Sequence, residues 1–326
     1  MKNIILCFDG TWQKPGTGDG FHSEESNIRT LYNMFDKEDE SAQVVCYDEG
    51  VGSHWYDHVL GGVFGRGLSK NIRDMYKELI NLYEDGDKVY VYGCSRGAYS
   101  ARSLCGFIYA CGLLKKSSSN RKIKQAFELY KSNDLNRKIN QKKYKKKNKL
   151  CPIEALGIFD TVGSLGIPFE MFDSINKYHN FHDTKVNREI KNVFHAKALD
   201  EKRKFFPLTP IDKNPNNTTT RIVASWFVGV HCDIGGGYKE HNTLKNISLE
   251  WMYKLSKESK VIFSEESYVF EHENPDKIYD SYTNFYKPFG ERKRVVNEDD
   301  VIHSSALERM ANDEDYNTSA TLKRAI

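Results

Sequence analysis

Residues 88–102 constrain the fold of this chain more than any other stretch, because they predict a strand, a sharp turn and a helix in immediate succession. Val89 to Tyr92 alternate β-branched and aromatic side chains, which favours a strand buried in a sheet. Gly93 and Gly97 then flank Ser95 in the pattern Gly-x-Ser-x-Gly. Glycines at these positions let a strand turn abruptly into a helix and leave room for a substrate carbonyl beside the serine. The stretch therefore predicts a nucleophilic serine at a strand-to-helix turn.

The five-residue pattern alone also fits an ordinary turn, so the hypothesis requires a base and an acid elsewhere in the chain. Asp160 ends a second predicted strand that begins at Ile153, and His231 ends a third that begins at Arg221. The carboxyl ends of parallel strands meet at one edge of an open α/β sheet. The chain order serine, aspartate, histidine therefore predicts a triad of Ser95, Asp160 and His231.

Other residues compete for these roles. Asp200 also follows a predicted strand and is an alternative acid, and His303 is an alternative base. His231, Asp233 and His241 could instead hold a metal, but their spacing matches no ordinary zinc pattern. We therefore expect neither a metal nor a cofactor.

The loop after the first predicted strand begins Asp9-Gly10-Thr11. In a serine hydrolase of this architecture, such a loop donates one backbone N–H to the oxyanion hole, and the residue after the nucleophile donates the other. We therefore expect the donors at Gly10 or Thr11 and at Arg96. The same three residues also end the Asp-x-Asp-Gly-Thr loop of aspartate-nucleophile phosphatases, but Cys7 occupies the nucleophile position, which disfavours that chemistry.

Strand and helix patterns alternate along the chain, which predicts an α/β fold with a mostly parallel central sheet flanked by helices. Apolar runs predict further strands at 3–8, 43–47 and 194–199, and apolar periodicity predicts a helix at 71–82. The glycine-rich run at 58–70 has the spacing of neither a P-loop nor a dinucleotide-binding loop. With 326 residues, 39% of them hydrophobic, the chain can bury one large core, so we expect a single domain over 1–326.

Residues 115–149, called the basic arm below, hold 14 Lys or Arg against Glu128 and Asp134, in a chain whose net charge is only +3. This segment is either a solvated insertion or an arm for an anionic surface such as a bilayer. We expect a short amphipathic helix around Phe127 and a flexible basic loop at 142–149. Nothing in the arm is suited to stacking bases, so nucleic acid is not the expected partner.

A second insertion, at 166–189, is apolar and aromatic. It predicts either a lid or acyl-binding wall, or a plain core helix.

No apolar run is long enough for a signal peptide or a membrane helix, which predicts a protein made in the cytoplasm. Seven cysteines without CxxC spacing indicate reduced thiols, and we interpret Cys94 as a small packing residue beside Ser95.

Taken together, the motifs resemble the uncharacterised α/β-hydrolase domain family to which the catalytic domains of type VI secretion phospholipase effectors belong. The resemblance runs from residue 1 to roughly residue 310, through segments that occur in one order: Phe8-Asp-Gly-Thr11, Tyr47-Asp-Glu-Gly-Val-Gly52, Gly93-Cys-Ser-Arg-Gly-Ala98, Phe159-Asp-Thr-Val-Gly-Ser164, Ala198-Leu-Asp-Glu-Lys-Arg203 and Trp226 to Tyr238.

The resemblance implies hydrolysis of phospholipid acyl esters, with the family triad mapping to Ser95, Asp160 and His231, and it is compatible with export by a dedicated secretion system. Two features depart from the family. Cys94 replaces the aromatic residue usual before the nucleophile, and the chain lacks the large membrane-docking C-terminal part of the longer effectors.

The predicted function is therefore a lipase-like serine hydrolase that acts through an acyl-enzyme. The alternative is a catalytically silent scaffold that binds a partner or an anionic surface, either nucleic acid or a membrane, through the basic arm.

Overall fold

The computed structural model describes residues 1–10, 22–50, 61–132, 134–163, 186–211, 217–238, 243–265, 268–270 and 278–323. In this part of the chain the central sheet has seven strands, every neighbouring pair parallel, in the order β10-β7-β6-β5-β4-β1-β3. Its strands are β1 (Asn3–Phe8), β3 (Gln43–Asp48), β4 (Lys88–Cys94), β5 (Ile153–Phe159), β6 (Ile190–Ala198), β7 (Arg221–Phe227) and β10 (Val301–Ile302). This confirms the predicted α/β-hydrolase-like fold.

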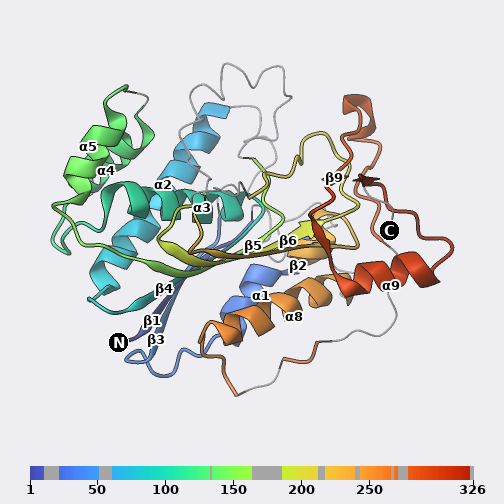
Figure 1. Cartoon of the computed structure of the whole chain (residues 1–326), viewed down its shortest axis with the longest axis horizontal. Coiled ribbons are helices and arrows are strands. Elements are labelled where there is room, and N and C mark those ends of the chain that lie inside the picture. Colours follow the sequence, from blue (N-terminus) through green and yellow to red (C-terminus); the bar gives the residue numbers. More distant parts are fainter. Residues whose placement is uncertain are drawn as a thin grey trace.

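Helices cover both faces of the sheet, which explains why the central strands are apolar almost throughout. On one face α2 (Gly61–Leu82), α3 (Arg96–Cys111) and α4 (Asn120–Lys131) share a buried core with β1, β4 and β5. On the other face α1 (Asn27–Met34) and α8 (Thr243–Glu258) pack on the same strands (Figure 1). Every residue of β1 is buried, as expected of a strand covered on both sides.

The strand order reverses at β1, since β3 pairs with one side of β1 and β4 with the other. In open α/β sheets, ligands bind beside the carboxyl ends of the strands at such a reversal. Ser95 follows β4 and Asp9 follows β1, so both residues lie at this point.

Shorter elements surround this framework. They are β2 (His22–Ser26), which pairs antiparallel with β8 (Gly236–Tyr238), then α5 (Arg137–Lys145), α7 (His231–Gly235), the 3₁₀ helix η2 (Lys287–Phe289), α9 (Ser304–Asn312), and β9 (Val295–Val296), which pairs parallel with β11 (Thr321–Leu322).

Several sequence predictions differ from the structure. The helix predicted at 71–82 begins earlier, at Gly61. The strand predicted at 194–199 begins at Ile190, whose neighbours Lys191 and Asn192 hid the pattern. The strand predicted to end at His231 stops at Phe227, and His231 instead begins α7. The break occurs because Gly229 has a φ of 116°, outside the strand region, and its N–H donates to Asp200.

Another difference lies in the basic arm, where the loop predicted at 142–149 is helical as far as Lys145. Lys, Arg and Gln are good helix formers, and Tyr144 packs on the core. The predicted helix around Phe127 is confirmed as α4. Most of the insertion at 166–189 lies outside the described residues.

Candidate active site

Ser95 lies between the end of β4 and the start of α3, and its backbone has a φ of 57° and a ψ of −120°. A positive φ is unusual for a residue with a side chain and costs about 1–3 kcal/mol. The two flanking glycines make this turn possible. A Cβ on Gly93 would lie 2.6 Å from the Gly97 carbonyl oxygen, and one on Gly97 would lie 2.2 Å from that of Phe8. The sequence therefore forms the strained serine elbow that the Gly-x-Ser-x-Gly pattern predicts.

The elbow is joined to the neighbouring strand, because the Ser95 N–H donates to the Phe159 carbonyl at 3.0 Å. Ser95 is 8% exposed. The adjacent Cys94 is buried with its thiol 3.8 Å from the Gly235 carbonyl, and burial raises the pKa of this thiol, so it stays protonated. The packing role expected of Cys94 is confirmed.

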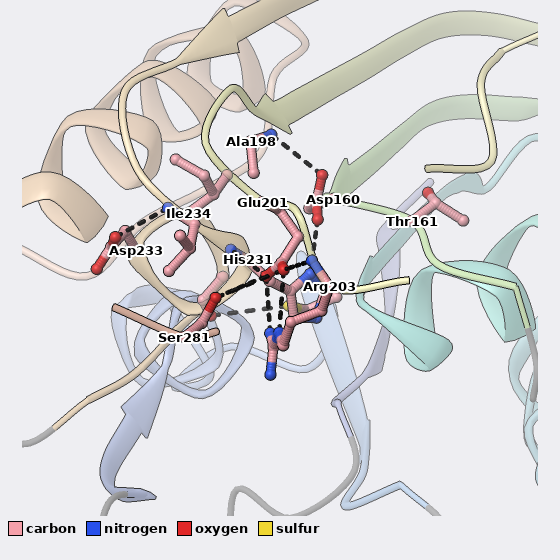
Figure 2. Close-up of polar contacts among 12 residues, drawn as sticks. Asp160, Thr161, Ala198, Glu201, Arg203, His231, Asp233, Ile234 and Ser281 are labelled. Atoms are coloured by element: carbon pink, nitrogen blue, oxygen red, sulfur yellow. Dashed lines mark hydrogen bonds and ion pairs between the residues drawn. The ribbon is translucent and has the colours of Figure 1, made fainter. Parts of the chain in front are cut away.

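Asp160 and His231 are in direct contact at the carboxyl edge of the sheet (Figure 2). One carboxylate oxygen of Asp160 lies 2.6 Å from His231 Nδ1, and the other accepts the Ala198 N–H at 3.0 Å. The Asp160 carboxylate is fully buried, and the His231 side chain is only 6% exposed. In the described part of the chain, no hydrogen bond joins the Ser95 hydroxyl to the His231 ring. The structure thus brings the predicted acid and base together and leaves the serine unbonded to the base.

Arg294 completes the surroundings of Asp160 and was not predicted. Its Nη2 donates at 2.8 Å to the same oxygen that contacts His231, and the Arg294 side chain is 4% exposed. Burial opposes ionisation of Asp160, but Arg294 and the His231 hydrogen bond outweigh it and hold the pKa of this carboxyl below its usual range. The run Glu291 to Arg294 resembles an exposed charged loop, so the sequence carries no signal for this contact.

A second buried ion pair fixes the backbone of the base. Glu201 accepts the His231 N–H at 3.2 Å and is held by two hydrogen bonds from the Arg203 guanidinium (Figure 2). Arg203 in turn lies 3.6 Å from the centre of the Phe206 ring, which meets the His231 ring edge-on at 5.2 Å. Sequence patterns assigned no role to these residues, because His231, which Glu201 and Phe206 contact, is remote from them in the chain.

The competing acid and base have other partners. Asp200 accepts hydrogen bonds from the Gly229 N–H at 2.8 Å and from the hydroxyls of Tyr316 and Thr318 at 3.0 and 2.8 Å. His303 caps α9 through Ser305, and its ring stacks on Phe227. Neither residue contacts His231, so the geometry favours Asp160 as the acid.

The loop after β1 is held by Asp9, whose carboxylate accepts the Gly10 N–H at 2.6 Å and the hydroxyls of Ser26 and Tyr47. Burial raises the pKa of Asp9 to about 6. The Gly10 N–H is therefore engaged in this state, and Thr11 lies outside the described residues. Arg96 begins α3, so its amide lies at the positive end of the helix dipole. Asp9, Arg96 and other residues line a cavity of about 10 Å³ between this loop and the elbow.

Among the described residues, no three His, Cys, Asp or Glu side chains are grouped so as to hold a metal ion. His241, a member of the alternative metal set, lies outside them. In the same part of the chain, no helix is both long and apolar enough to span a bilayer.

The fold and the site define an α/β-hydrolase-like protein with a serine elbow beside a buried aspartate–histidine pair. The model of the family described as T6SS, phospholipase effector Tle1-like, catalytic domain matches residues 2–255. The chain belongs to this family.

Individual relatives resemble only part of the chain. The uncharacterized protein YEL023C of Saccharomyces cerevisiae is 32% identical over 228 residues, which cover 62% of this chain and 31% of that protein. An uncharacterized protein from Pseudomonas aeruginosa, known from a crystal structure, shares the fold with a TM-score of 0.54 at 19% identity, over 81% of this chain and 46% of that one. A Tle1 effector bound to the VgrG spike has a TM-score of 0.39 at 21% identity, over 73% of this chain and 51% of that one. The chain thus matches about a third to a half of the length of these relatives.

Proposed function

We propose that the protein is a serine hydrolase that cleaves acyl esters of phospholipids through a covalent acyl-enzyme. The observation that carries this proposal is the buried contact of 2.6 Å between Asp160 and His231, at the sheet edge where the strained Ser95 elbow lies. Membership of a family named for phospholipase effectors supports the lipid substrate and export by a secretion system.

In the proposed first step, His231 Nε2 removes the Ser95 hydroxyl proton as Ser95 Oγ attacks the ester carbonyl carbon. The tetrahedral intermediate then collapses, and His231 passes the proton to the leaving alcohol oxygen. A water molecule, deprotonated by the same ring, attacks the acyl-enzyme and releases the acid, while the proton returns to Ser95.

Asp160 has two roles in this mechanism. Its carboxylate keeps the proton of the neutral His231 ring on Nδ1, which leaves Nε2 as the base, and its negative charge stabilises the imidazolium. Because Arg294 favours the ionised carboxylate, Asp160 remains charged throughout the cycle.

The oxyanion would be bound by backbone N–H groups of Arg96 and of the loop at Gly10 and Thr11. The Gly10 N–H donates to Asp9 in this structure, so it would have to turn toward the substrate or leave this role to Thr11.

Ser95→Ala tests the proposal. We expect it to lower ester hydrolysis about 10⁴- to 10⁶-fold, the usual effect of removing a triad member. It should also abolish labelling by a fluorophosphonate probe, read by mass spectrometry, while the melting temperature stays nearly constant. Ser117→Ala, on an exposed turn outside the site, is the matched control and should be labelled like the wild type. An active Ser95→Ala enzyme, or a folded wild type that is never labelled, would contradict the mechanism and favour the silent scaffold.

A further inference from the structure

A band of aromatic side chains leads from the His231 ring to the protein surface. The ring of Phe206 lies 5.2 Å from that of His231, Tyr286 lies 6.1 Å from Phe206, and Phe285 lies 5.0 Å from Tyr286. The band therefore joins the candidate base to solvent without a break. We call the whole group the aromatic ledge: Phe205, Phe206, Tyr282, Phe285, Tyr286 and Phe289.

Two segments remote in sequence build the ledge. Residues 202–206 follow β6, and residues 282–292 lead into β9, which lies at the right of Figure 1. Two backbone contacts hold them together. The Arg292 N–H donates to the Lys202 carbonyl at 2.8 Å, and Arg203 and Glu291 form an isolated antiparallel β-bridge. The ledge is thus part of the folded framework of the site.

The outer end of the ledge is unusually apolar for a protein surface. Phe285 is 67% exposed and Phe289 is 41% exposed, and their rings lie 6.0 Å apart. Contiguous exposed apolar side chains mark surfaces that bind a partner, a membrane or a ligand. Aromatic rings also favour the boundary between lipid headgroups and acyl chains.

Positive charge lies close to these rings in the sequence. Five cations stand on the two segments and their flanks, against the carboxylates of Asp280 and Glu291; the cations are Lys202, Lys204, Lys287, Arg292 and Lys293. The buried Arg203 and Arg294 are excluded, since each is paired with a buried carboxylate. Exposed phenylalanine rings that are accompanied by cations are complementary to a bilayer that carries anionic headgroups.

We propose that the aromatic ledge docks on the surface of an anionic phospholipid bilayer. Phe285 and Phe289 enter the headgroup region, and the accompanying cations contact the phosphates. This placement turns the carboxyl edge of the sheet toward the lipid, so an acyl ester reaches Ser95 along Phe206. The last step rests on the proposed function, whereas the docking does not.

The test measures binding of the full-length chain to sedimented vesicles, with Ser95→Ala present in every protein so that no lipid is consumed. The vesicles contain phosphatidylcholine with or without phosphatidylglycerol. Because binding grows with buried apolar area and with charge attraction, we expect Phe285→Ser/Phe289→Ser to weaken binding to the anionic vesicles about tenfold or more. Lys287→Gln/Lys293→Gln should weaken it about tenfold and lower its sensitivity to salt.

Matched controls come from the basic arm. Leu135→Ser/Ile139→Ser removes two apolar side chains that are 101% and 54% exposed, and Lys142→Gln/Lys143→Gln removes two exposed cations. Both should bind vesicles like the parent, and all variants should melt near the parent temperature.

Two results would overturn the docking proposal: absence of binding by the parent, or binding by Phe285→Ser/Phe289→Ser as strong as that of the parent. Loss of binding only in the arm variants would assign docking to the arm instead. Ledge-dependent binding by a protein whose Ser95 is never labelled would refute the chemistry and leave the docking intact, so the two proposals fail separately.

Discussion

The protein presents basic surface at both ends of its sheet, and the two regions differ in what their charges contact. The basic arm holds α4 and α5, which lie at the left of Figure 1, far from β9 at the right. The arm is tied to the amino ends of two strands: Lys149 pairs with Asp85, before β4, and Lys145 pairs with Glu189, just before β6. The aromatic ledge lies at the carboxyl ends, beside His231.

Several cations of the arm already have partners in the fold. Lys116 pairs with Glu84, and Lys149 pairs with Asp85 at 3.1 Å. The segments of the ledge and their flanks carry fewer cations, but these lie next to exposed aromatic residues in the sequence. The comparison teaches that the number of charges in a segment does not indicate where a substrate approaches. A bilayer held by the arm would meet the end of the sheet opposite to Ser95.

The largest expected effect separates the two candidate acids at the carboxyl end. Asp160→Asn should lower turnover about 10⁴-fold, because it favours the wrong tautomer of His231. Asp200→Asn should act mainly on stability, since Asp200 only holds backbone and hydroxyl groups. Kinetics and thermal unfolding of both variants make the test, and the reverse pattern would move the acid role to Asp200.

Arg294 provides a second test at this end. Arg294→Met leaves Asp160 without its buried cation, so we expect about a 10²-fold loss of activity from a misplaced base. The pH below which activity is lost should also rise, because the buried Asp160 carboxylate is protonated more readily without Arg294. Arg294→Lys should recover part of both effects.

Arg221→Met, which breaks an exposed ion pair with Glu258, is the matched control for Arg294. It should leave both the rate and the pH profile unchanged. A pH profile of Arg294→Met identical to that of the wild type would show that Arg294 only stabilises the fold.

The two ends should also differ in how pH affects stability. Burial raises the pKa of Asp233, next to His231, to about 7, so this group binds a proton in the folded state that the unfolded chain releases near pH 4. Its contribution to the free energy of unfolding therefore falls as pH rises from about 4 to 7. At the amino end, burial opposes ionisation of Asp87, but hydrogen bonds from Lys2 lower its pKa. Asp87 therefore stabilises the protein above about pH 4, and this contribution is lost as pH falls below that value.

Denaturant unfolding measures this difference against the wild type, for Asp233→Asn at pH 4 and pH 7.5 and for Asp87→Asn at pH 2.5 and pH 5. Relative to the wild type, Asp233→Asn should gain stability on going to the higher pH, and Asp87→Asn should lose it. If the stability of both variants relative to the wild type changed with pH in the same direction, the opposite pKa shifts of Asp233 and Asp87 would be contradicted.

The smallest expected effect concerns the arm itself. Replacing its exposed lysines 138, 142, 143, 146 and 147 with Gln should change hydrolysis of a short soluble ester, and of anionic vesicles, by less than about twofold, because the arm lies away from the site. A large loss on vesicles alone would instead support the membrane role of the arm that its composition indicates.

The parts of the fold that the sequence predicted are those fixed by local patterns. The strands β1, β3, β4 and β5 consist mainly of apolar or β-branched residues, and Gly93 meets a steric demand of the nearby Gly97. The meeting of Asp160 with His231 followed from the rule that parallel strands share a carboxyl edge.

The remaining features depend on contacts between distant segments. Arg294 lies in a run of charges typical of an exposed loop, and only the packing of the C-terminal segment buries it. The aromatic ledge combines residues 202–206 with residues 282–292, and neither segment has a periodic pattern that predicts its partner. The end of β7 was placed too late because Gly229 breaks the strand to satisfy Asp200.

The long reach of these contacts has a consequence for the folding of the protein. Asp160 is 71 positions from His231 and 134 from Arg294, and the Ser95 elbow is itself bonded to the distant Phe159 carbonyl. Closing long loops costs entropy, so contacts between distant residues form late. A partly folded chain therefore lacks an oriented base and a formed elbow. In the proposed hydrolase, reactivity toward lipids would thus arise only at the last stage of folding, and incompletely folded molecules would be harmless to the membranes of the cell that makes them.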